Sequence, residues 1–244
     1  MIGYDPVKLS QEIERIVAKG KLRKYYRFRG TRFYGGIATA DCVGCNLSCY
    51  YCWSDKPRKR PGEIGRFYSP KEVVDKIIAI MGKRDFSQAR ISGNEPTIAR
   101  EHLIATLKEF TRRSNARFIL ETNGILLGHD ESYAYEVANL KQVHVRVSLK
   151  GCGPEQFFKL TGAKPEAFEL QLKALENLVN AWGSCHAAVM GEFASGRDLI
   201  ALEERLAAID PSLKRDLEFE HLMLFPHVRR QLTKHGIKIN SRPL

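Results

Sequence analysis

Four of the six cysteines in this 244-residue chain lie within eleven residues, at positions 42, 45, 49 and 52. Cys45, Cys49 and Cys52 are spaced C-x3-C-x2-C. Thiols this close together in a chain without an export signal are typical of a metal centre. Three thiolates leave one iron of a four-iron cluster open, and reactions take place at open metal positions. We therefore predict that these three cysteines hold a reactive metal cluster.

The alternative is a zinc knuckle in which Cys42 joins the other three cysteines as a fourth ligand. Only three residues separate the two C-x2-C pairs, whereas zinc ribbons usually have a dozen or more. This spacing favours the three-cysteine cluster. Cys42 is then either a packed small hydrophobe or a substitute ligand.

The cysteine spacing, together with Tyr51 just before the last cysteine, resembles the signature of radical S-adenosylmethionine (SAM) enzymes. The resemblance implies one 4Fe–4S cluster on Cys45, Cys49 and Cys52, with SAM on the open iron and Tyr51 among the cofactor-binding residues. It implies that the reduced cluster cleaves SAM, and that a 5′-deoxyadenosyl radical then removes hydrogen from a substrate. It also implies a low-potential electron donor of the ferredoxin or flavodoxin type.

Strand-like and helix-like patterns alternate along most of the chain. We expect strands at 35–41, 88–92, 117–122, 143–149, 186–190 and 217–224, with helices between them. Such alternation predicts an α/β fold with a parallel sheet, right-handed crossovers and helices outside. Six units leave a barrel partly open, so the expected fold is a partial (β/α)6 barrel, as the radical SAM resemblance also implies.

We expect residues 1–34 to form an N-terminal helix and a basic lead-in, and residues 35–244 to form the barrel domain. Asp5 and Pro6 are typical of a helix start, and Gly20 ends the pattern. No run of 18 apolar residues and no signal-peptide layout is present in the sequence. We therefore expect a cytoplasmic monomer without a membrane contact.

The net charge of +11 suggests an anionic partner, either RNA or an acidic protein. The densest basic run, 19–32, is interleaved with Tyr25, Tyr26 and Phe28. This pattern suits base stacking with phosphate contacts, or a solvated surface whose Tyr and Phe side chains point inward at alternate positions. Residues 54–68 are basic and rich in proline and glycine, and they are predicted to form a long loop that contacts substrate.

Two polar segments at strand ends resemble SAM-binding motifs. Gly93-Asn94-Glu95-Pro resembles the Gly-Gly-Glu-Pro turn, and this implies that Glu95, with the backbone of Gly93 and Asn94, receives the SAM ammonium group. Thr122-Asn123-Gly is similar to a segment at the next strand end in many family members. The resemblance implies that its side chains reach the SAM ribose or carboxylate.

Two further segments resemble the activases of glycyl radical enzymes. Ser148-Leu-Lys150, with the later Leu-Thr-Gly, implies that Lys150 neutralises the SAM carboxylate, although Ser148 replaces the activases' aspartate. Leu-Phe-Pro-His227 implies that His227 lies along the adenine. Cys152 follows the same strand as Lys150, so it is either a hydrogen-atom donor to the substrate or an inert, half-buried thiol.

These observations predict a radical SAM enzyme with a protein substrate, as in the activases. The alternative enzyme is one that modifies RNA or tRNA. The alternative that is not an enzyme is a zinc-knuckle module that binds RNA.

Overall fold

A nine-stranded sheet runs through residues 2–239, the part of the chain that the computed structural model describes. The strand order is β1-β2-β3-β5-β6-β7-β8-β9, with β4 paired to β2. The strands are β1 (Ala18–Lys19), β2 (Leu22–Thr31), β3 (Ile37–Cys42), β4 (Arg66–Tyr68), β5 (Gln88–Ser92), β6 (Arg117–Thr122), β7 (Val143–Leu149), β8 (Ser184–Met190) and β9 (Glu218–Glu220).

The strands β3, β5, β6, β7, β8 and β9 are parallel to one another. They are the six strands predicted from the sequence, and the bounds of β5, β6 and β7 match the prediction. The α/β fold with six parallel strands and helices around the sheet is thus confirmed.

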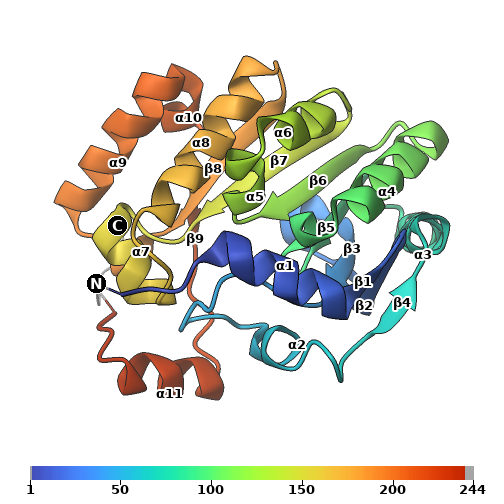
Figure 1. Ribbon diagram of the computed structural model, residues 1–244. Helices are drawn as coiled ribbons and strands as arrows, with labels where there is room; N and C mark the ends of the chain where they lie inside the picture. Colours follow the sequence, from blue (N-terminus) through green and yellow to red (C-terminus); the bar gives the residue numbers. More distant parts are fainter. Residues whose placement is uncertain (1, 240–244) are drawn as a thin grey trace.

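Helices α3, α4, α6, α8 and α9 follow one another around the outer side of the sheet, whereas α11 lies apart from them at the bottom of the view (Figure 1). The α-helices are α1 (Pro6–Val17), α2 (Asp55–Lys59), α3 (Pro70–Arg84), α4 (Arg100–Arg113), α5 (Ile125–His129), α6 (Glu131–Ala138), α7 (Pro154–Thr161), α8 (Ala167–Asn180), α9 (Gly196–Ile209), α10 (Pro211–Arg215) and α11 (Pro226–Lys234). Short 3₁₀ turns are η1 (Phe33–Gly35), η2 (Pro96–Ile98) and η3 (Gly191–Phe193).

Helix α3 shows how the sequence builds the outer layer. Ser69 accepts from the Glu72 N–H, and the Glu72 side chain accepts from the Ser69 N–H, so the predicted capping box begins the helix. One turn later Val73 and Ile77 of the apolar stripe are fully buried in the same core as Ala38 and Ala40 of β3. Burial of each such branched side chain stabilises the fold by about 1.5–3 kcal/mol.

The opposite face of the sheet is polar, because side chains alternate along each strand. Hydrogen bonds and ion pairs connect these side chains from one strand to the next. The residues are Thr39, Asp41, Arg90, Ser92, Glu121, His144, Arg146, Ser148, His186, Glu218 and Glu220. The inside of the partial barrel is therefore lined by charged and polar groups.

The basic segment 19–32 forms the long strand β2, antiparallel to β3, which the sequence analysis did not predict. Its ring side chains Tyr25 and Phe28 stack at 5.6 Å and join the core, as one of the two interpretations expected. Arg23 is 1% exposed and Lys24 is 7% exposed. The idea that Arg23 and Lys24 contact phosphates is therefore wrong, since their charged ends are bonded inside the fold.

Segment 54–68 contains regular structure rather than one long loop. Residues 55–59 form α2, and β4 pairs with β2. The buried Lys24 donates from Nζ to the carbonyls of Pro61 and Gly62, both at 2.8 Å. Segment 54–68 is therefore attached to β2 at residues 61–62 and along β4.

The sixth parallel strand is shorter than predicted. The ladder of β9 ends at Glu220, and the N–H of Leu222 donates to the carboxylate of Glu192 at 3.0 Å instead of to a strand. Residue 1 and residues 240–244, at the ends of the two predicted segments, lie outside the described range. Among the described helices, none has the length and apolar character needed to cross a membrane.

Candidate functional site

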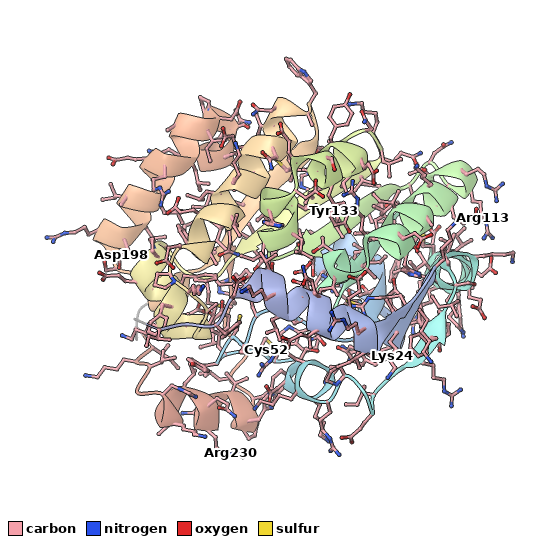
Figure 2. The ribbon with its side chains drawn as sticks, viewed as in Figure 1. Lys24, Cys52, Arg113, Tyr133, Asp198 and Arg230 are labelled. Carbon is pink, nitrogen blue, oxygen red and sulfur yellow. The ribbon has the colours of Figure 1, made fainter. Side chains whose placement is uncertain are left out.

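The cysteine loop begins at the carboxyl end of β3, at the edge where the other parallel strands also end. Parallel α/β barrels carry their reactive groups at this edge. Cys49 is 8% exposed, and Cys45 and Cys52 are partly buried. In Figure 2, Cys52 lies toward the middle of the molecule, whereas Arg230 of α11 projects at the lower margin.

The turn after β5 holds both ends of the cysteine loop. Asn94 Oδ1 accepts from the Gly44 N–H at 3.0 Å, and Asn94 Nδ2 donates to the Ser54 carbonyl at 3.1 Å. The Glu95 N–H donates to the Gly44 carbonyl at 3.0 Å. Gly93 has φ +104°, and a Cβ there would lie 2.8 Å from the Cys42 nitrogen. Only glycine therefore allows this close approach of β5 to β3.

The Glu95 carboxylate joins the turn after β5 to the end of β6. Its Oε1 accepts from the N–H and the hydroxyl of Thr97 and from the Thr122 hydroxyl, and its Oε2 accepts from the Asn123 N–H at 2.8 Å. The side chain is buried. The sequence analysis treated Glu95 as a cofactor contact, but in this structure it also positions Thr122 and Asn123.

The Cys45 thiol lies among amide groups. The Leu47 N–H donates to its sulfur at 3.4 Å, and Asn123 Nδ2 lies 3.9 Å from it. Asn123 Nδ2 also donates to Asn46 Oδ1 at 2.7 Å. The buried Asn46 Nδ2 and the Tyr51 hydroxyl have no hydrogen-bond partner in the described chain. Unpaired buried polar atoms beside the thiols fit a site built for a further group.

Burial keeps the three thiols protonated in the protein alone. It raises the pKa of Cys45 far above its usual range and that of Cys49 to a lesser degree, although Lys150 and Arg58 oppose the increase at Cys49. Burial, and then the neighbouring Cys49, raises the pKa of Cys52 to about 11. A bound metal deprotonates coordinating thiols, so binding here would release protons.

A zinc knuckle requires donors that converge on one ion. Within residues 2–239, no three side chains of His, Cys, Asp or Glu are grouped in that way. In an iron–sulfur cluster, by contrast, each cysteine binds its own iron. The three thiols with their neighbouring amide donors suit such a cluster.

Lys150 lies beside Ser148 and Glu220 at the end of β7. Lys150 Nζ donates to the Ser148 hydroxyl, which donates to Glu220 Oε1 at 2.8 Å. Burial acts to raise the pKa of the Glu220 carboxyl, but Lys150 and Arg146 outweigh it and the pKa is lowered. The activases have an aspartate at the position of Ser148. In this chain a carboxylate lies nearby instead, on Glu220 of β9. The sequence analysis missed Glu220, although its alternation with Glu218 on the sixth strand was a usable signal.

Tyr4 is a second residue that the sequence analysis missed. Its hydroxyl accepts from the Ser48 N–H inside the cysteine loop at 2.7 Å and donates to the Thr161 carbonyl at 3.3 Å. Tyr50 of the loop stacks on His235 with the rings 3.6 Å apart. The N-terminal segment, α7 and the chain after α11 therefore all support the loop.

The other predicted site residues have these surroundings. Tyr51 is buried against Phe193, with ring centroids 5.0 Å apart. His227 lies at the start of α11, and its buried Nε2 has no partner in the described chain. The Cys152 N–H donates to Gln156 Oε1 at 2.7 Å, and burial followed by Asp198 raises the pKa of the Cys152 thiol to about 12.

Cys42 packs as a hydrophobe. Its side chain is fully buried in the main core, and burial raises the pKa of its thiol to about 11. This outcome agrees with one of the two roles that the sequence left open for it.

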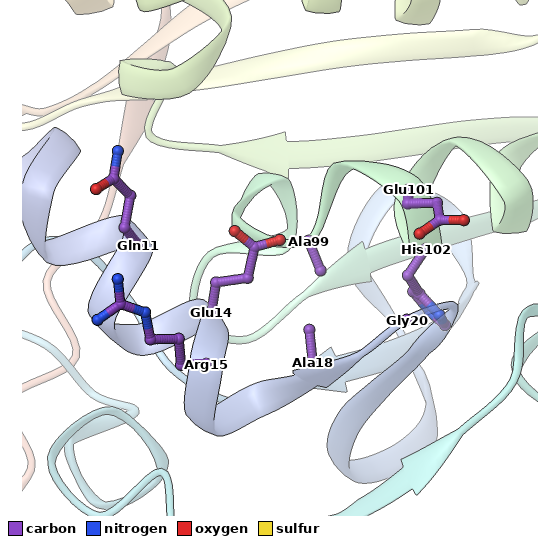
Figure 3. Close-up of a pocket in the computed structure, with 8 residues that line it drawn as sticks. All are labelled: Gln11, Glu14, Arg15, Ala18, Gly20, Ala99, Glu101 and His102. Carbon is purple, nitrogen blue, oxygen red and sulfur yellow. The ribbon is translucent and has the colours of Figure 1, made fainter.

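A cavity of about 420 Å³ lies on the outer side of the molecule (Figure 3). It is formed by α1, by the turn between β1 and β2, and by the start of α4. The lining residues are Gln11, Glu14, Arg15, Ala18, Gly20, Ala99, Glu101 and His102. None of the predicted cofactor residues is among them.

Comparison with known proteins agrees with this site. The profile of the Radical SAM superfamily matches residues 41–206, more than half of the chain. The chain is similar to a probable GTP 3′,8-cyclase of Methanosarcina acetivorans, 32% identical over 60% of this chain and 42% of that protein. It is also similar to a 7-carboxy-7-deazaguanine synthase of Methanothermobacter thermautotrophicus, 34% identical over 38% of this chain and 35% of that protein.

Among solved structures, the fold is similar to that of SuiB from Streptococcus suis bound to its precursor peptide SuiA. The TM-score is 0.61 and the identity 16%, with 84% of this chain and 47% of SuiB covered. The chain thus spans less than half of the length of these relatives. They include a probable GTP 3′,8-cyclase and a 7-carboxy-7-deazaguanine synthase, whereas the sequence motifs resembled glycyl-radical-enzyme activases.

The family profile spans the cysteine loop, the turns after β5 and β6, and Lys150. We conclude that the chain belongs to the radical SAM superfamily, whose characteristic cofactors are a 4Fe–4S cluster and SAM.

Proposed function

We propose that this chain is an enzyme that cleaves SAM reductively at a single 4Fe–4S cluster and abstracts hydrogen from a nucleotide-type substrate. The observation that carries the proposal is the loop of Cys45, Cys49 and Cys52, which is hydrogen-bonded to the turn after β5 at both ends. When bound, the reduced cluster supplies the electron that cleaves SAM, and the 5′-deoxyadenosyl radical removes the substrate hydrogen.

The groups around Cys45 favour its thiolate form once a cluster is bound. The Leu47 N–H and the Asn123 amide point toward its sulfur. Hydrogen bonds to cluster sulfurs stabilise negative charge and tune the reduction potential. We therefore assign to Leu47 and Asn123 the role of adjusting the cluster rather than binding it.

We assign the amino-acid part of SAM to the turn after β5 and to Lys150. Glu95 Oε2 accepts one hydrogen bond from the protein, so it has a lone pair for an ammonium group, together with the carbonyls of Gly93 and Asn94. The Lys150 ammonium group is the natural partner for the SAM carboxylate. Its neighbour Glu220 balances that charge until SAM binds.

The remaining assignments follow the sequence motifs. Thr122 and Ser148 are proposed contacts of the SAM ribose or carboxylate, and His227 is the proposed contact of the adenine. Tyr51 is proposed to border the cofactor. Cys152 keeps its S–H bond at neutral pH because its pKa is raised, and a neutral thiol is the form that can donate a hydrogen atom.

We propose a nucleotide-type substrate in preference to the protein substrate that the sequence motifs favoured. The two similar curated proteins carry names that specify GTP and a deazaguanine, and neither name supports an activase. The polar lining of the barrel is compatible with a substrate that offers many donors and acceptors. A protein backbone and tRNA remain the alternatives.

Family members need a reductant, and we propose a ferredoxin- or flavodoxin-type donor for this chain. The net charge of +11 favours an acidic protein of this kind. A cytoplasmic location and a monomeric state remain predictions.

The test is anaerobic reconstitution followed by incubation with SAM, dithionite and purine nucleotides that carry deuterium on carbon. We expect about four irons per chain, 5′-deoxyadenosine, and deuterium in that product. Cys45→Ala should lose all three results. Cys185→Ala, which removes a half-buried thiol outside the loop, is the matched control and should keep them. Stoichiometric zinc without iron after reconstitution would overturn the proposal, and deuterium transfer only from a peptide or from tRNA would replace the substrate class.

A further inference from the structure

Two arginines of β2 share one buried carboxylate next to the cysteine loop. Arg27 Nε and Arg29 Nε donate to Asp41 Oδ2 at 2.6 and 2.7 Å, and Arg29 Nη2 donates to Oδ1 at 3.3 Å. The Asp41 side chain is fully buried, at 0% exposed. Two guanidinium groups against one carboxylate leave a net positive charge at this corner of the sheet.

Arg27 is held in a way that leaves its outer edge available. Its Nε donates to Asp41, whereas Nη1 and Nη2 have no hydrogen-bond acceptor among residues 2–239. Its side chain is 41% exposed. A guanidinium fixed at one nitrogen presents a planar pair of N–H donors, which is the geometry that binds phosphate through two parallel hydrogen bonds. Because the side chain is already ordered, binding costs less conformational entropy.

Trp53 adds an aromatic surface to the same corner. The guanidinium groups of Arg27 and Arg29 lie 5.6 and 5.9 Å from its ring, and the residue is 39% exposed. Trp53 directly follows Cys52 in the chain, at the end of the cysteine loop. An exposed ring beside cations suits a ligand that joins a flat base to an anionic group.

The corner lies on the open side of the barrel, at the reactive end. Arg27 is opposite Asp41 in the β2–β3 register, and Asp41 is opposite Ser92 at the end of β5. On the other edge of β2, β4 pairs only with residues 23–25. Within the described chain, no strand covers the edge of β2 from residue 27 to residue 31. A ligand can therefore approach this corner from solvent and extend toward the cysteine loop.

We propose that Arg27, Arg29 and Trp53 form the phosphate-binding corner of the substrate site, which receives a nucleotide whose base lies near Trp53. This inference rests on the proposed function and names the substrate class of the same site. A phosphate can belong to a free nucleotide or to an RNA chain, and both present the same group to Arg27.

The test is equilibrium dialysis of the reconstituted, cluster-loaded protein against radiolabelled GMP, guanosine and a short single-stranded RNA. Arg27→Gln should raise the Kd for GMP about tenfold or more, as is typical when a charge-assisted hydrogen bond to phosphate is lost. Its Kd for guanosine should stay within twofold of wild type, because guanosine has no phosphate. Arg27→Lys should fall between wild type and Arg27→Gln, because it retains the charge without the planar fork.

Arg205→Gln is the matched control. Arg205 is 40% exposed, pairs with Glu169 and lies 5.6 Å from the Phe168 ring, but on α9. It should leave GMP binding unchanged. If Arg27→Gln is unstable, Trp53→Leu provides a second variant, which should weaken binding of both GMP and guanosine.

Equal affinity of wild type and Arg27→Gln for GMP and for RNA would overturn the inference. If Arg27→Gln weakens only RNA binding, the phosphate corner stands and RNA is the source of the phosphate. Formation of 5′-deoxyadenosine by the wild-type protein is measured in parallel. SAM cleavage without Arg27-dependent binding rejects this corner alone, whereas absence of SAM cleavage rejects the proposed function.

Discussion

The Asn94 side chain accepts a hydrogen bond from the Gly44 N–H at 3.0 Å. Its amide group also donates to the Ser54 carbonyl at 3.1 Å. Gly44 and Ser54 flank the three cysteines, so one side chain holds both ends of the loop. The residue that departs from the family's Gly-Gly-Glu-Pro turn therefore has a structural role that glycine could not perform.

Asn94→Ala should weaken the hold on the cluster. The substitution removes both hydrogen bonds that tie the turn after β5 to the ends of the loop, and a net hydrogen bond typically contributes about 0.5–1.5 kcal/mol. The Gly44 N–H keeps a second acceptor, the Pro57 carbonyl at 3.2 Å. We expect reconstituted Asn94→Ala to release iron to a chelator several-fold faster than wild type. Asn115→Ala removes an exposed asparagine and should release iron at the wild-type rate. Equal rates for the two variants would show that the loop does not depend on Asn94.

The second prediction concerns which of the cysteines are needed to hold the cluster. Alanine at Cys45, Cys49 or Cys52 should each abolish the iron-dependent absorbance, because each removes a ligand. Cys42→Ala should retain it, because Cys42 is a core side chain of β3. Iron and sulfide analysis after reconstitution measures all four variants. Loss of the cluster in Cys42→Ala, with a wild-type circular dichroism spectrum, would contradict this assignment.

The fold was predictable where local pattern and burial agree. The strands β5, β6 and β7 are short segments that mix apolar and polar residues between helical segments, so their bounds could be read directly. Strand β2 was not predictable, because its buried cations donate hydrogen bonds to groups that are distant in sequence. Arg23 Nη2, for example, donates to the carbonyl of Glu95, 72 residues away.

The site was predictable at the level of motifs but not of contacts. The thiol spacing identified the loop, since the ligands are close in sequence. Glu220 was missed because its role depends on a neighbour, Ser148, 72 residues earlier. The substrate subgroup was misjudged because short motifs at strand ends are shared across a superfamily, whereas substrate contacts come from side chains such as Arg27 that no motif marks.

Lys150 and Glu95 should behave differently when substituted. Lys150→Ala should keep the cluster but lose SAM binding by at least tenfold, because it removes the cation proposed to pair with the SAM carboxylate. Glu95→Ala should lose SAM binding and also retain less iron, since Glu95 holds Asn123 and Thr122 in place. Isothermal titration with SAM and iron analysis separate the two effects. Full iron retention by Glu95→Ala would contradict its positioning role.

Arg146 should be essential to the stability of the barrel interior. It donates to Glu218 at 2.8 and 2.9 Å and to Glu220 at 2.7 Å, and its side chain is 8% exposed. Arg146→Met removes the buried guanidinium that the two carboxylates share, so we expect a loss of about 3–5 kcal/mol in the free energy of unfolding. Arg112→Met, which breaks an exposed pair with Glu109, should cost less than about 1 kcal/mol. Urea denaturation measures both variants.

The final prediction concerns the acid sensitivity of the fold and its source in buried histidines. Burial lowers the pKa of His102 from 6.5 to about 4, and burial followed by Arg117 lowers that of His144 to about 4. The unfolded chain therefore binds protons below pH 6.5 that the folded chain does not accept until about pH 4. The free energy of unfolding must fall as the pH decreases through this window, by roughly 2 kcal/mol per histidine between pH 6.5 and 5.

His102→Gln removes one of these two groups, so the loss of stability between pH 6.5 and 5 should be smaller by roughly 2 kcal/mol than in wild type. At pH 7 the variant should be less stable than wild type, because His102 bonds to the Tyr25 hydroxyl at 3.0 Å and to the Lys21 carbonyl at 2.8 Å. The exposed His129→Gln is the control and should keep the wild-type pH dependence. Urea denaturation at several pH values gives the slopes. A slope for His102→Gln as steep as that of wild type would mean that His102 binds its proton equally well in the folded and the unfolded chain.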